Sequence, residues 1–276
     1  MKDDLGDRMK GNYEDRTRHL LPRRTYTIAR LDGKAFHTYT RNLKKPFDND
    51  LFEDIDAAII AMLPEIQGAV FAYTQSDEIS ILLTDFATPN TSAWFDGNLQ
   101  KMCSVSASIM TAEFNRLRLI GWLKGKRYKS TIMPRMFTTA DDIPVAYFDS
   151  RIFTIPDRIE VMNYFIWRNQ DCSRNSVAMV AQSLYSHKEL MGKNISEQQE
   201  MIHNKGKSWV NDYSMGEKNG RLIVKESYRT DNLCGEVNLK DGLPSDPIMR
   251  TRWVSKGAWK FTEDKTKLLG MIPEYE

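Results

Sequence analysis

The sequence predicts an α+β protein whose antiparallel sheet carries helices on one face. Three patterns within residues 1–160 support this fold class. β-Forming residues at 25–31 end in an Asp-Gly turn, two short apolar runs flank a polar turn at 74–78, and apolar residues recur at helical spacing between these segments. The predicted order is therefore strand, helix, hairpin, helix and strand.

The first predicted helix covers residues 51–63. Its apolar residues form one face: Leu51, Phe52, Ile55, Ala58, Ile59, Met62 and Leu63. We expect Asp50 and Glu53 to form a capping box at its start and Pro64 to end it. Further along the chain, the same patterns predict the hairpin at 69–73 and 79–83, a helix over 99–117, a strand over 145–155 and a helix beginning at 159.

Beyond about residue 190, the periodicity weakens into polar sequence that contains Gly and Lys. A tight turn at 216–220 is expected to lead into a strand at 221–224, because Asn-Gly favours hairpin turns. We therefore divide the chain after residue 157. Residues 158–276 are expected to form a helical and hairpin extension that packs on residues 1–157 as one unit.

Composition places the chain among ordinary globular proteins, with 41% of its 276 residues apolar and 28% charged. Its longest uninterrupted apolar run, from Ala57 to Leu63, is much shorter than the roughly 20 residues of a membrane-spanning helix, so no membrane association is expected. The polar N-terminus lacks a signal-peptide pattern. Cys103, Cys172 and Cys234 are too far apart for a disulfide framework or a zinc site, which indicates reduced thiols in the cytoplasm.

The net charge of +2 conceals two basic clusters. One contains four arginines at residues 16–24, and the other fills an interval without acidic residues between Glu113 and Asp141. Such clusters suit a phosphate backbone, since each neutralised phosphate releases condensed counterions. A solvated loop without a partner explains the same composition, so charge alone decides nothing.

Two acidic turns are the strongest candidates for a chemical site: residues 32–34 (Asp-Gly-Lys) and 76–78 (Ser-Asp-Glu). In an antiparallel sheet, a strand end and a neighbouring hairpin turn can face each other. Two carboxylates meeting there repel unless a divalent cation holds them. Mg²⁺ takes such oxygen ligands together with substrate phosphates, and a helix starting near Phe36 would add free N–H groups beside Lys34. Asp is also common in ordinary turns, so both interpretations stay open at this point.

Longer motifs around these turns resemble the tRNA(His) guanylyltransferase family. Residues 30–37 (Arg-Leu-Asp-Gly-Lys-Ala-Phe-His) and 45–48 (Lys-Pro-Phe-Asp) carry the first part of the resemblance, and 73–80 (Tyr-Thr-Gln-Ser-Asp-Glu-Ile-Ser) is highly specific for the family. Shorter agreements extend the match over residues 3–185, namely 5–10, 21–22, 101 and 148–151. The resemblance implies a fold like the palm domain of template-directed polymerases, with 1–157 as the catalytic core and 158–276 as an RNA-binding extension.

The resemblance also implies roles for particular residues. Asp32, the carbonyl of Gly33 and Asp77 correspond to ligands of two Mg²⁺ ions, and the two aspartates are the expected catalytic residues. The residues expected to bind the nucleotide and its triphosphate are Gly33, Lys34, Ala35, Phe36, His37, Lys45, Ser76 and Lys101. A helix histidine satisfied by packing is the alternative for His37. Glu78 is expected to have a supporting role at most, since its side chain should point away from that of Asp77 if both lie in a strand.

The activity implied by the resemblance is 3′-to-5′ addition of nucleotides to the 5′ end of tRNA. ATP or GTP first activates the 5′-monophosphate, and the 3′-hydroxyl of GTP or another NTP then attacks the activated phosphate. The resemblance further implies a homotetramer. The expected RNA contacts are Lys124, Lys126, Arg127, Lys129 and Asn175.

One segment departs from the family pattern. Eukaryotic members carry His-Ile-Asn-Asn-Leu-Tyr-Asn after a Trp-Arg-x-x-Asp-Cys element. Here residues 167–172 keep that element, but 173–179 read Ser-Arg-Asn-Ser-Val-Ala-Met, and only Asn175 keeps the chemistry of the signature. The chain therefore looks more like the bacterial and archaeal guanylyltransferase-like proteins, which repair 5′-truncated tRNAs by base-paired addition. The alternatives are dedicated addition of guanosine to tRNA(His), a nucleotide cyclase that uses NTP without RNA, and a catalytically inactive tRNA-end-binding protein.

Overall fold

The computed structural model describes residues 4–123, 144–230 and 248–275. Within these residues, six strands form one sheet in the spatial order β4-β1-β3-β2-β5-β6, and each neighbouring pair is antiparallel. The strands are β1 (Tyr26–Gly33), β2 (Ala69–Gln75), β3 (Glu78–Leu83), β4 (Phe148–Ile155), β5 (Arg221–Thr230) and β6 (Ile248–Gly257). The predicted α+β class and antiparallel sheet are confirmed.

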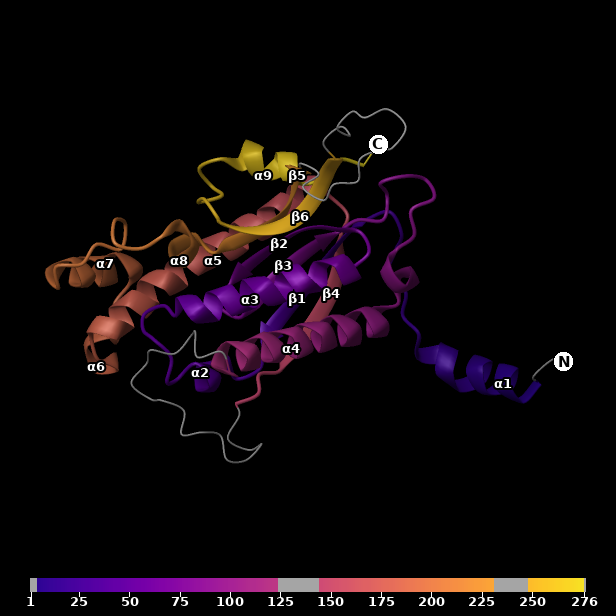
Figure 1. The fold of residues 1–276 in the computed structure, drawn as a ribbon, viewed down its shortest axis with the longest axis horizontal. Coiled ribbons are helices and arrows are strands. Elements are labelled where there is room, and N and C mark those ends of the chain that lie inside the picture. Colours follow the sequence, from indigo (N-terminus) through magenta and orange to yellow (C-terminus); the bar gives the residue numbers. More distant parts are fainter. Residues whose placement is uncertain (1–3, 124–143, 231–247, 276) are drawn as a thin grey trace, which may run out of the picture.

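Two long helices, α3 (Asn49–Met62) and α4 (Leu99–Leu123), cover one face of the sheet (Figure 1). Leu31, Ile79 and Ile81 are fully buried in the cluster that these helices form with the strands. They alternate along their strands with residues of the opposite face. The apolar stripe of α3 and the alternation of β3 thus bury a common surface, as the sequence pattern indicated.

The start of α3 differs from the prediction. Its cap is Asp48, whose carboxylate accepts hydrogen bonds from the backbone N–H groups of Lys44 and Leu51, and not Asp50. Pro64 ends the helix as expected, within a 3₁₀ turn at Leu63–Glu65. Asp48 therefore fixes the preceding loop to the helix at the same time as it caps it.

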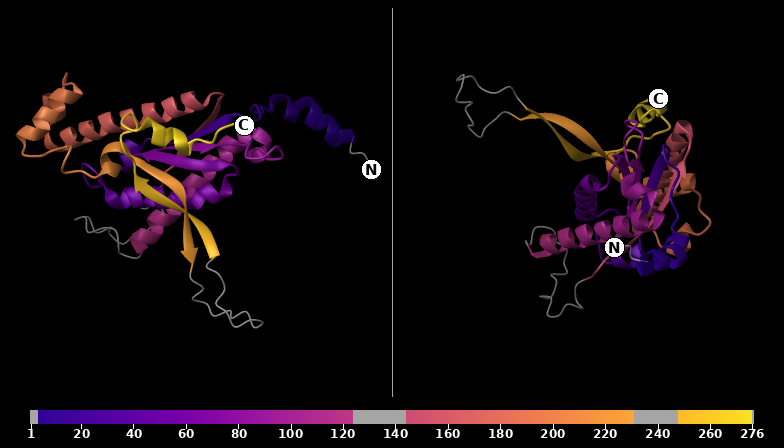
Figure 2. Two further views of the ribbon diagram at one scale, coloured as in Figure 1. Left: turned by 90° about the horizontal axis from the view of Figure 1, so that it is seen from above. Right: turned by 90° about the vertical axis from the view of Figure 1, so that its right-hand side faces the viewer.

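The opposite face is covered by α5 (Arg158–Leu184) and the short helix α9 (Lys265–Met271). Figure 2 shows the two helical layers on either side of the sheet. Ile28, Phe71 and Leu82 pack there with Phe165 of α5. The two long helices of residues 1–157, α3 and α4, thus lie on one face, as predicted, whereas the complete sheet is covered on both faces because α5 packs on the other.

The tight turn predicted at 216–220 was wrong. Met215–Asn219 forms α8, which begins with a reciprocal capping box between Ser214 and Glu217. Gly220 follows the helix with a φ of 80°, a conformation that favours glycine. β5 then pairs with both β2 and β6, and the β5–β6 ribbon extends away from the rest of the molecule (Figure 2).

The other helices are short. α1 (Asp4–Met9) buries no residue and projects from the body of the protein (Figure 1). A π-helical turn at Lys10–Glu14 and a 3₁₀ turn at Asp15–Thr17 continue it. The remaining helices are α2 (Phe36–Tyr39), α6 (His187–Leu190) and α7 (Ile195–Asn204), and Trp94–Gly97 forms a turn in which Phe95 and Asp96 have positive φ angles. In the part of the chain that the structure describes, no helix has the length and apolar character needed to cross a membrane.

Candidate active site

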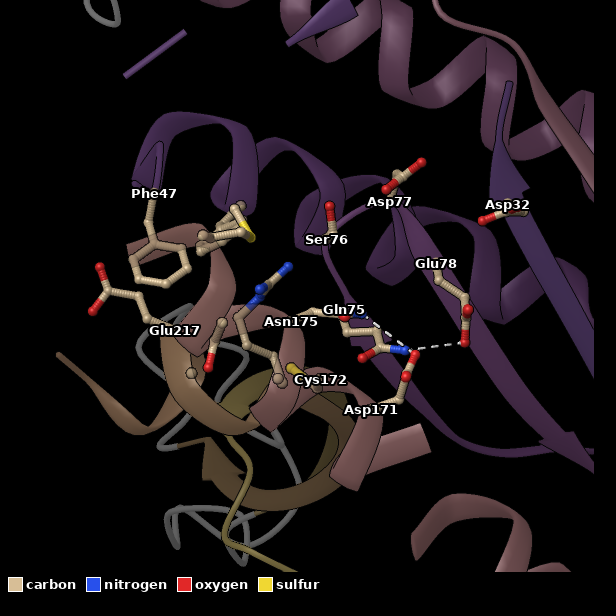
Figure 3. Close-up of a pocket in the computed structure, with 16 residues that line it drawn as sticks. Asp32, Phe47, Gln75, Ser76, Asp77, Glu78, Asp171, Cys172, Asn175 and Glu217 are labelled. Atoms are coloured by element: carbon tan, nitrogen blue, oxygen red, sulfur yellow. Dashed lines mark hydrogen bonds between the residues drawn. The ribbon is translucent and has the colours of Figure 1, made fainter. Parts of the chain in front are cut away.

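The two acidic turns identified in the sequence meet at one end of the sheet. β1 and β3 are neighbours, and their antiparallel register pairs Leu31 with Ile79. Continuing this register by two residues places Gly33 beside Asp77, in the turn that precedes β3. Asp32 and Asp77 consequently lie on the same side of one pocket (Figure 3).

Gly33 lies directly against the carboxylate of Asp77. A Cβ atom at position 33 would be 2.8 Å from Oδ2 of Asp77 and 2.4 Å from Cδ2 of Phe36. Both separations are shorter than van der Waals contact, so glycine is the residue that fits between these two side chains. The absence of a side chain at position 33 therefore lets the Asp77 carboxylate approach the end of β1.

Burial and neighbouring negative charges oppose the ionisation of both carboxylates. Burial has the largest effect and raises the pKa of Asp77 to about 6, while a hydrogen bond from Ser76 opposes the rise and the charges of Asp32 and Glu78 add to it. The pKa of Asp32 is also raised, by burial first and then by the charges of Glu78 and Asp149. A bound cation would reverse these effects because it favours the ionised forms.

The donor set fits Mg²⁺. Among the residues that the structure describes, no three His, Cys, Asp or Glu side chains gather into a group that could hold a metal ion. Mg²⁺ does not need such a group, because it usually binds one or two carboxylates and completes its shell with waters and substrate phosphates. Asp32, Asp77 and the carbonyl of Gly33 are oxygen donors of this kind.

The loop after β1 follows Asp32 and Gly33 directly in the chain, but its residues Lys34, Ala35 and His37 are not among those that line the pocket. Lys34 is exposed, and its backbone N–H donates to the carbonyl of Tyr147 over 2.8 Å. Ala35 adopts the left-handed conformation, with a φ of 51°, immediately before α2. His37 is exposed, with ring Nε2 3.1 Å from Oγ1 of Thr38. The alternative of a histidine satisfied by packing is therefore wrong.

Phe36 differs from its neighbours because its side chain belongs to the core. It is 5% exposed, and its ring lies 5.0, 5.8 and 5.6 Å from those of Tyr39, Phe114 and Phe148, measured between centroids. The ring thus supports the loop from within the protein. The buried ring is therefore not available to contact a nucleotide in this arrangement. A contact through the backbone N–H of Phe36 stays a prediction.

Neither of the predicted lysines Lys45 and Lys101 is among the residues that line the pocket. Lys45 is exposed, and its Nζ donates to the carbonyl of Thr40 over 3.2 Å. Lys101 is exposed in the first turn of α4. Ten residues further along this helix, the hydroxyl of Thr111 accepts a hydrogen bond from the backbone N–H of Phe148, which pairs with Gly33 at the end of β1. At 1.5 Å per residue, Lys101 is about 15 Å along the helix from this level. The structure therefore does not bring Lys101 to the pocket.

The predicted RNA contacts fall into two groups. Asn175 is exposed on α5 and lines the pocket, with Nδ2 3.4 Å from Oδ2 of Asp171. The basic residues Lys124, Lys126, Arg127 and Lys129 lie outside the described residues. Their contact with RNA stays a prediction.

A cavity of about 270 Å³ opens beside the two carboxylates. Figure 3 shows Asp32 and Asp77 on one side of it and residues of α5 on another. Besides the predicted residues, the lining includes Phe47, Phe52, Gln75, Cys172, Met179, Glu217 and Arg221. The sequence patterns did not identify these residues as part of the lining of a pocket. The motif at 73–80 contained Gln75, but Arg221 comes from a polar C-terminal region that gave no comparable signal.

Glu78 forms the main polar contact between the sheet and α5. It is 9% exposed, and its carboxylate accepts from Arg168 over 2.6 and 2.8 Å and from Arg30 over 2.5 Å. Asp77 lies in the turn rather than in a strand, so the expected alternation of its side chain with that of Glu78 does not apply. The Trp-Arg-x-x-Asp-Cys motif contained Arg168, but a partner 90 residues away cannot be deduced from spacing.

Known proteins share this fold and these motifs. A sequence model of the family described as tRNAHis guanylyltransferase matches residues 6–156 of the chain. Two solved structures of a bacterial tRNA(His) guanylyltransferase (Thg1)-like protein, one in complex with ATP and one with GTP, align with 98% of this chain and 99% of theirs. Their sequence identities are 37% and 35%, and their TM-scores are 0.77 and 0.75. The tRNA(His) guanylyltransferase of Debaryomyces hansenii is 27% identical over 224 residues, which cover 77% of each chain.

Taken with the carboxylates at the strand ends, these similarities define the chain as a nucleotidyltransferase. It belongs to the tRNAHis guanylyltransferase family.

Proposed function

We propose that the protein adds nucleotides in the 3′-to-5′ direction to the 5′ end of tRNA, and that it does so by template-dependent repair of 5′-truncated tRNA. The observation that carries the proposal is the contact of the Asp77 carboxylate with Gly33, at the side of a pocket that Asp32 also lines. Paired carboxylates support phosphoryl transfer, which depends on positioning and charge neutralisation more than on a protein nucleophile.

The proposed reaction has two steps at this site. An oxygen of the tRNA 5′-monophosphate attacks the α-phosphorus of ATP or GTP, and pyrophosphate leaves. The 3′-hydroxyl of the incoming NTP then attacks the activated 5′-phosphorus, which forms the new phosphodiester and releases the nucleoside monophosphate. A 5′-triphosphorylated RNA would skip the first step because it already carries pyrophosphate as a leaving group.

Particular residues of this chain would do the positioning. Asp32, Asp77 and the carbonyl of Gly33 would hold Mg²⁺, and two bound ions would neutralise charge on the attacking and leaving oxygens. Lys34 and His37 are exposed in the segment that follows Asp32 and Gly33, and they would bind triphosphate oxygens. The solved bacterial relatives were in complex with ATP and with GTP, which supports both nucleotides as substrates here.

Two observations favour repair over dedicated addition of guanosine: the sequence of α5 after residue 172 and the similarity to bacterial relatives. Residues 173–179 replace the eukaryotic signature, and Asn175, which alone keeps its chemistry, lines the pocket. The bacterial guanylyltransferase-like structures are also more similar to this chain than the D. hansenii guanylyltransferase is, at 37% and 27% identity. Both observations support a template-dependent activity.

Dedicated addition of guanosine to tRNA(His) is the second candidate, and the name of the D. hansenii relative supports it. An inactive tRNA-end-binding protein has less support, because both carboxylates are present and adjacent. A nucleotide cyclase would leave the basic clusters without a partner.

The proposed partners are tRNA and nucleoside triphosphates. We further propose a cytoplasmic homotetramer in which residues 1–157 form the catalytic core and 158–276 contribute to RNA binding. Lys124, Lys126, Arg127 and Lys129 would contact the acceptor stem.

The experiment that tests the proposal compares two labelled RNAs: a tRNA that lacks its first 5′ nucleotide and a full-length tRNA(His). Each is incubated with protein, Mg²⁺, ATP and NTPs, and product lengths are read on a gel. Templated repair predicts extension of the truncated tRNA and a loss of at least about 100-fold in the Asp77→Asn variant. Growth of full-length tRNA(His) alone would support the second candidate, and growth of neither RNA would contradict both.

A further inference from the structure

A buried carboxylate lies next to the two proposed metal ligands, which are themselves half-buried. Glu78 follows Asp77 in the chain, and its charge raises the pKa of both Asp77 and Asp32. It is 9% exposed, so water screens its charge poorly. An uncompensated carboxylate there would strengthen the repulsion at this end of the sheet and would be free to move toward a cation.

Arg168 compensates this charge with a defined geometry. Its Nε donates to Oε1 of Glu78 over 2.6 Å and its Nη2 donates to Oε2 over 2.8 Å, so the two planar groups meet side by side. Arg30 donates to Oε2 from β1 over 2.5 Å. Both oxygens of Glu78 are therefore occupied by guanidinium groups, and the carboxylate is held in one orientation.

Arg168 is itself fixed on α5. Its Nη2 also donates to Oδ2 of Asp171 over 2.8 Å, and its guanidinium lies 4.3 Å from the ring centroid of Trp167. At 4% exposed, it has little room to move. The ion pair with Glu78 thus connects a rigid helix of one layer to the start of β3 in the sheet.

This connection acts on Asp77 through a very short segment. Only residues 76 and 77 separate β2 from β3, and Ser76 has a φ of 49°, an uncommon conformation for a residue with a side chain. Gln75 on the other side of the turn also donates to Oε1 of Glu78, over 3.3 Å. Because Glu78 is anchored on both sides, the backbone of Asp77 has little freedom.

We propose that Arg168 is a positioning residue for the reaction: by holding Glu78 it fixes the turn that carries Asp77, so that the carboxylates of Asp77 and Asp32 stay together for a divalent cation. This inference rests on the proposed function. In this role, Arg168 acts through Glu78 and contacts neither nucleotide nor RNA. It also explains why a charged pair is kept in a buried place, where burial by itself costs free energy.

The test uses Mn²⁺ as a spectroscopic probe and compares Arg168→Lys with wild type. Lysine keeps the charge but cannot form the paired contacts of the guanidinium. Mn²⁺ affinity of the full-length protein, without nucleotide or RNA, is measured by electron paramagnetic resonance. We expect Arg168→Lys to weaken Mn²⁺ binding about 10–100-fold, as loss of a group that orients metal ligands usually does.

Arg158→Lys is the matched control because it is the same substitution on the same helix. Arg158 donates to the carbonyls of Leu269 and Ile272, at the α9 contact. It should reduce Tm without changing Mn²⁺ affinity more than about twofold, since it orients no metal ligand. Arg30→Lys is the second test variant should Arg168→Lys not fold, and a smaller loss of affinity is expected because it removes one contact rather than two.

The outcomes separate this inference from the proposed function. Suppose that wild type binds Mn²⁺, that Asp77→Asn does not, and that Arg168→Lys binds it as well as wild type does. This result would overturn the positioning role of Arg168 and would still support the metal site. Wild type that binds no more Mn²⁺ than Asp77→Asn would overturn both.

Discussion

Oδ2 of Asp77 would lie 2.8 Å from a Cβ atom on Gly33, so the carboxylate occupies the space that a side chain at position 33 would need. The end of β1 and the turn before β3 are therefore interlocked. This contact explains why the segment Asp-Gly-Lys carries a glycine at a position whose φ does not require one, because the requirement comes from the neighbouring carboxylate.

Substituting Gly33 by alanine should consequently abolish activity. The added methyl group would displace Asp77 or Phe36, and we expect nucleotide addition to fall at least about 100-fold, as when an electrostatic stabiliser is lost. The same overpacking should destabilise the fold by about 1–3 kcal/mol. Gly270→Ala is the control, because a Cβ there meets nothing within 4 Å. Wild-type activity in Gly33→Ala would contradict the interlocking.

Asp77→Asn should stabilise the metal-free protein while it removes activity. Because the folded-state pKa of Asp77 is raised to about 6 from an ordinary value of 3.8, the folded state binds the proton more tightly than the unfolded state does. The contribution of Asp77 to the free energy of unfolding therefore falls as pH rises through the window of about 4–6. Above this window the cost of keeping the ionised carboxylate in the folded protein is complete. After allowance for partial exposure, we expect a gain of about 1–3 kcal/mol at pH 7.5.

Thermal unfolding of both proteins in EDTA at pH 4 and pH 7.5 measures this effect. The Tm difference should be near zero at the lower pH and favour Asp77→Asn at the higher pH. If Asp77→Asn is less stable than wild type at pH 7.5, other groups of the protein already compensate the negative charge of Asp77, and the expected gain is contradicted.

Phe36 and His37 are neighbours with opposite roles in this structure. Phe36→Ala should reduce the free energy of unfolding by about 3–5 kcal/mol, because it removes a core ring. His37→Ala should change Tm little, since the imidazole is exposed, but should raise the KM for NTP. Denaturant unfolding and steady-state kinetics distinguish the two. A His37→Ala variant with unchanged KM would remove His37 from the nucleotide site.

The basic segment after α4 is predicted to contact the RNA backbone. Neutralising Lys124, Lys126 and Arg127 together should weaken tRNA binding and reduce the slope of log affinity against log salt by about 2–3, if each residue neutralises one phosphate. Asp77→Asn should bind tRNA with the wild-type slope. An unchanged slope in the triple variant would favour the solvated-loop interpretation.

Much of the fold was predictable because local patterns determined it. The apolar stripe of α3 and the alternation in β3 each identified their own buried face, and motif similarity paired Asp32 with Asp77. Features that depend on distant partners were not predictable. The strand β5 gave only a short apolar run, yet it extends the sheet beside β2, and α8 replaced an expected turn because Ser214 and Glu217 cap a helix there. The contact of Arg168 with Glu78 likewise exists only in three dimensions.

The most direct test of templated addition uses two truncated tRNAs that differ only in the 3′-strand base opposite the missing nucleotide. Each is incubated with the wild-type protein, Mg²⁺, ATP and one NTP at a time, and the incorporated nucleotide is identified by product length. We predict that incorporation follows the template, with G added opposite C and C added opposite G. Addition of G to both RNAs, or to neither, would contradict template-dependent repair.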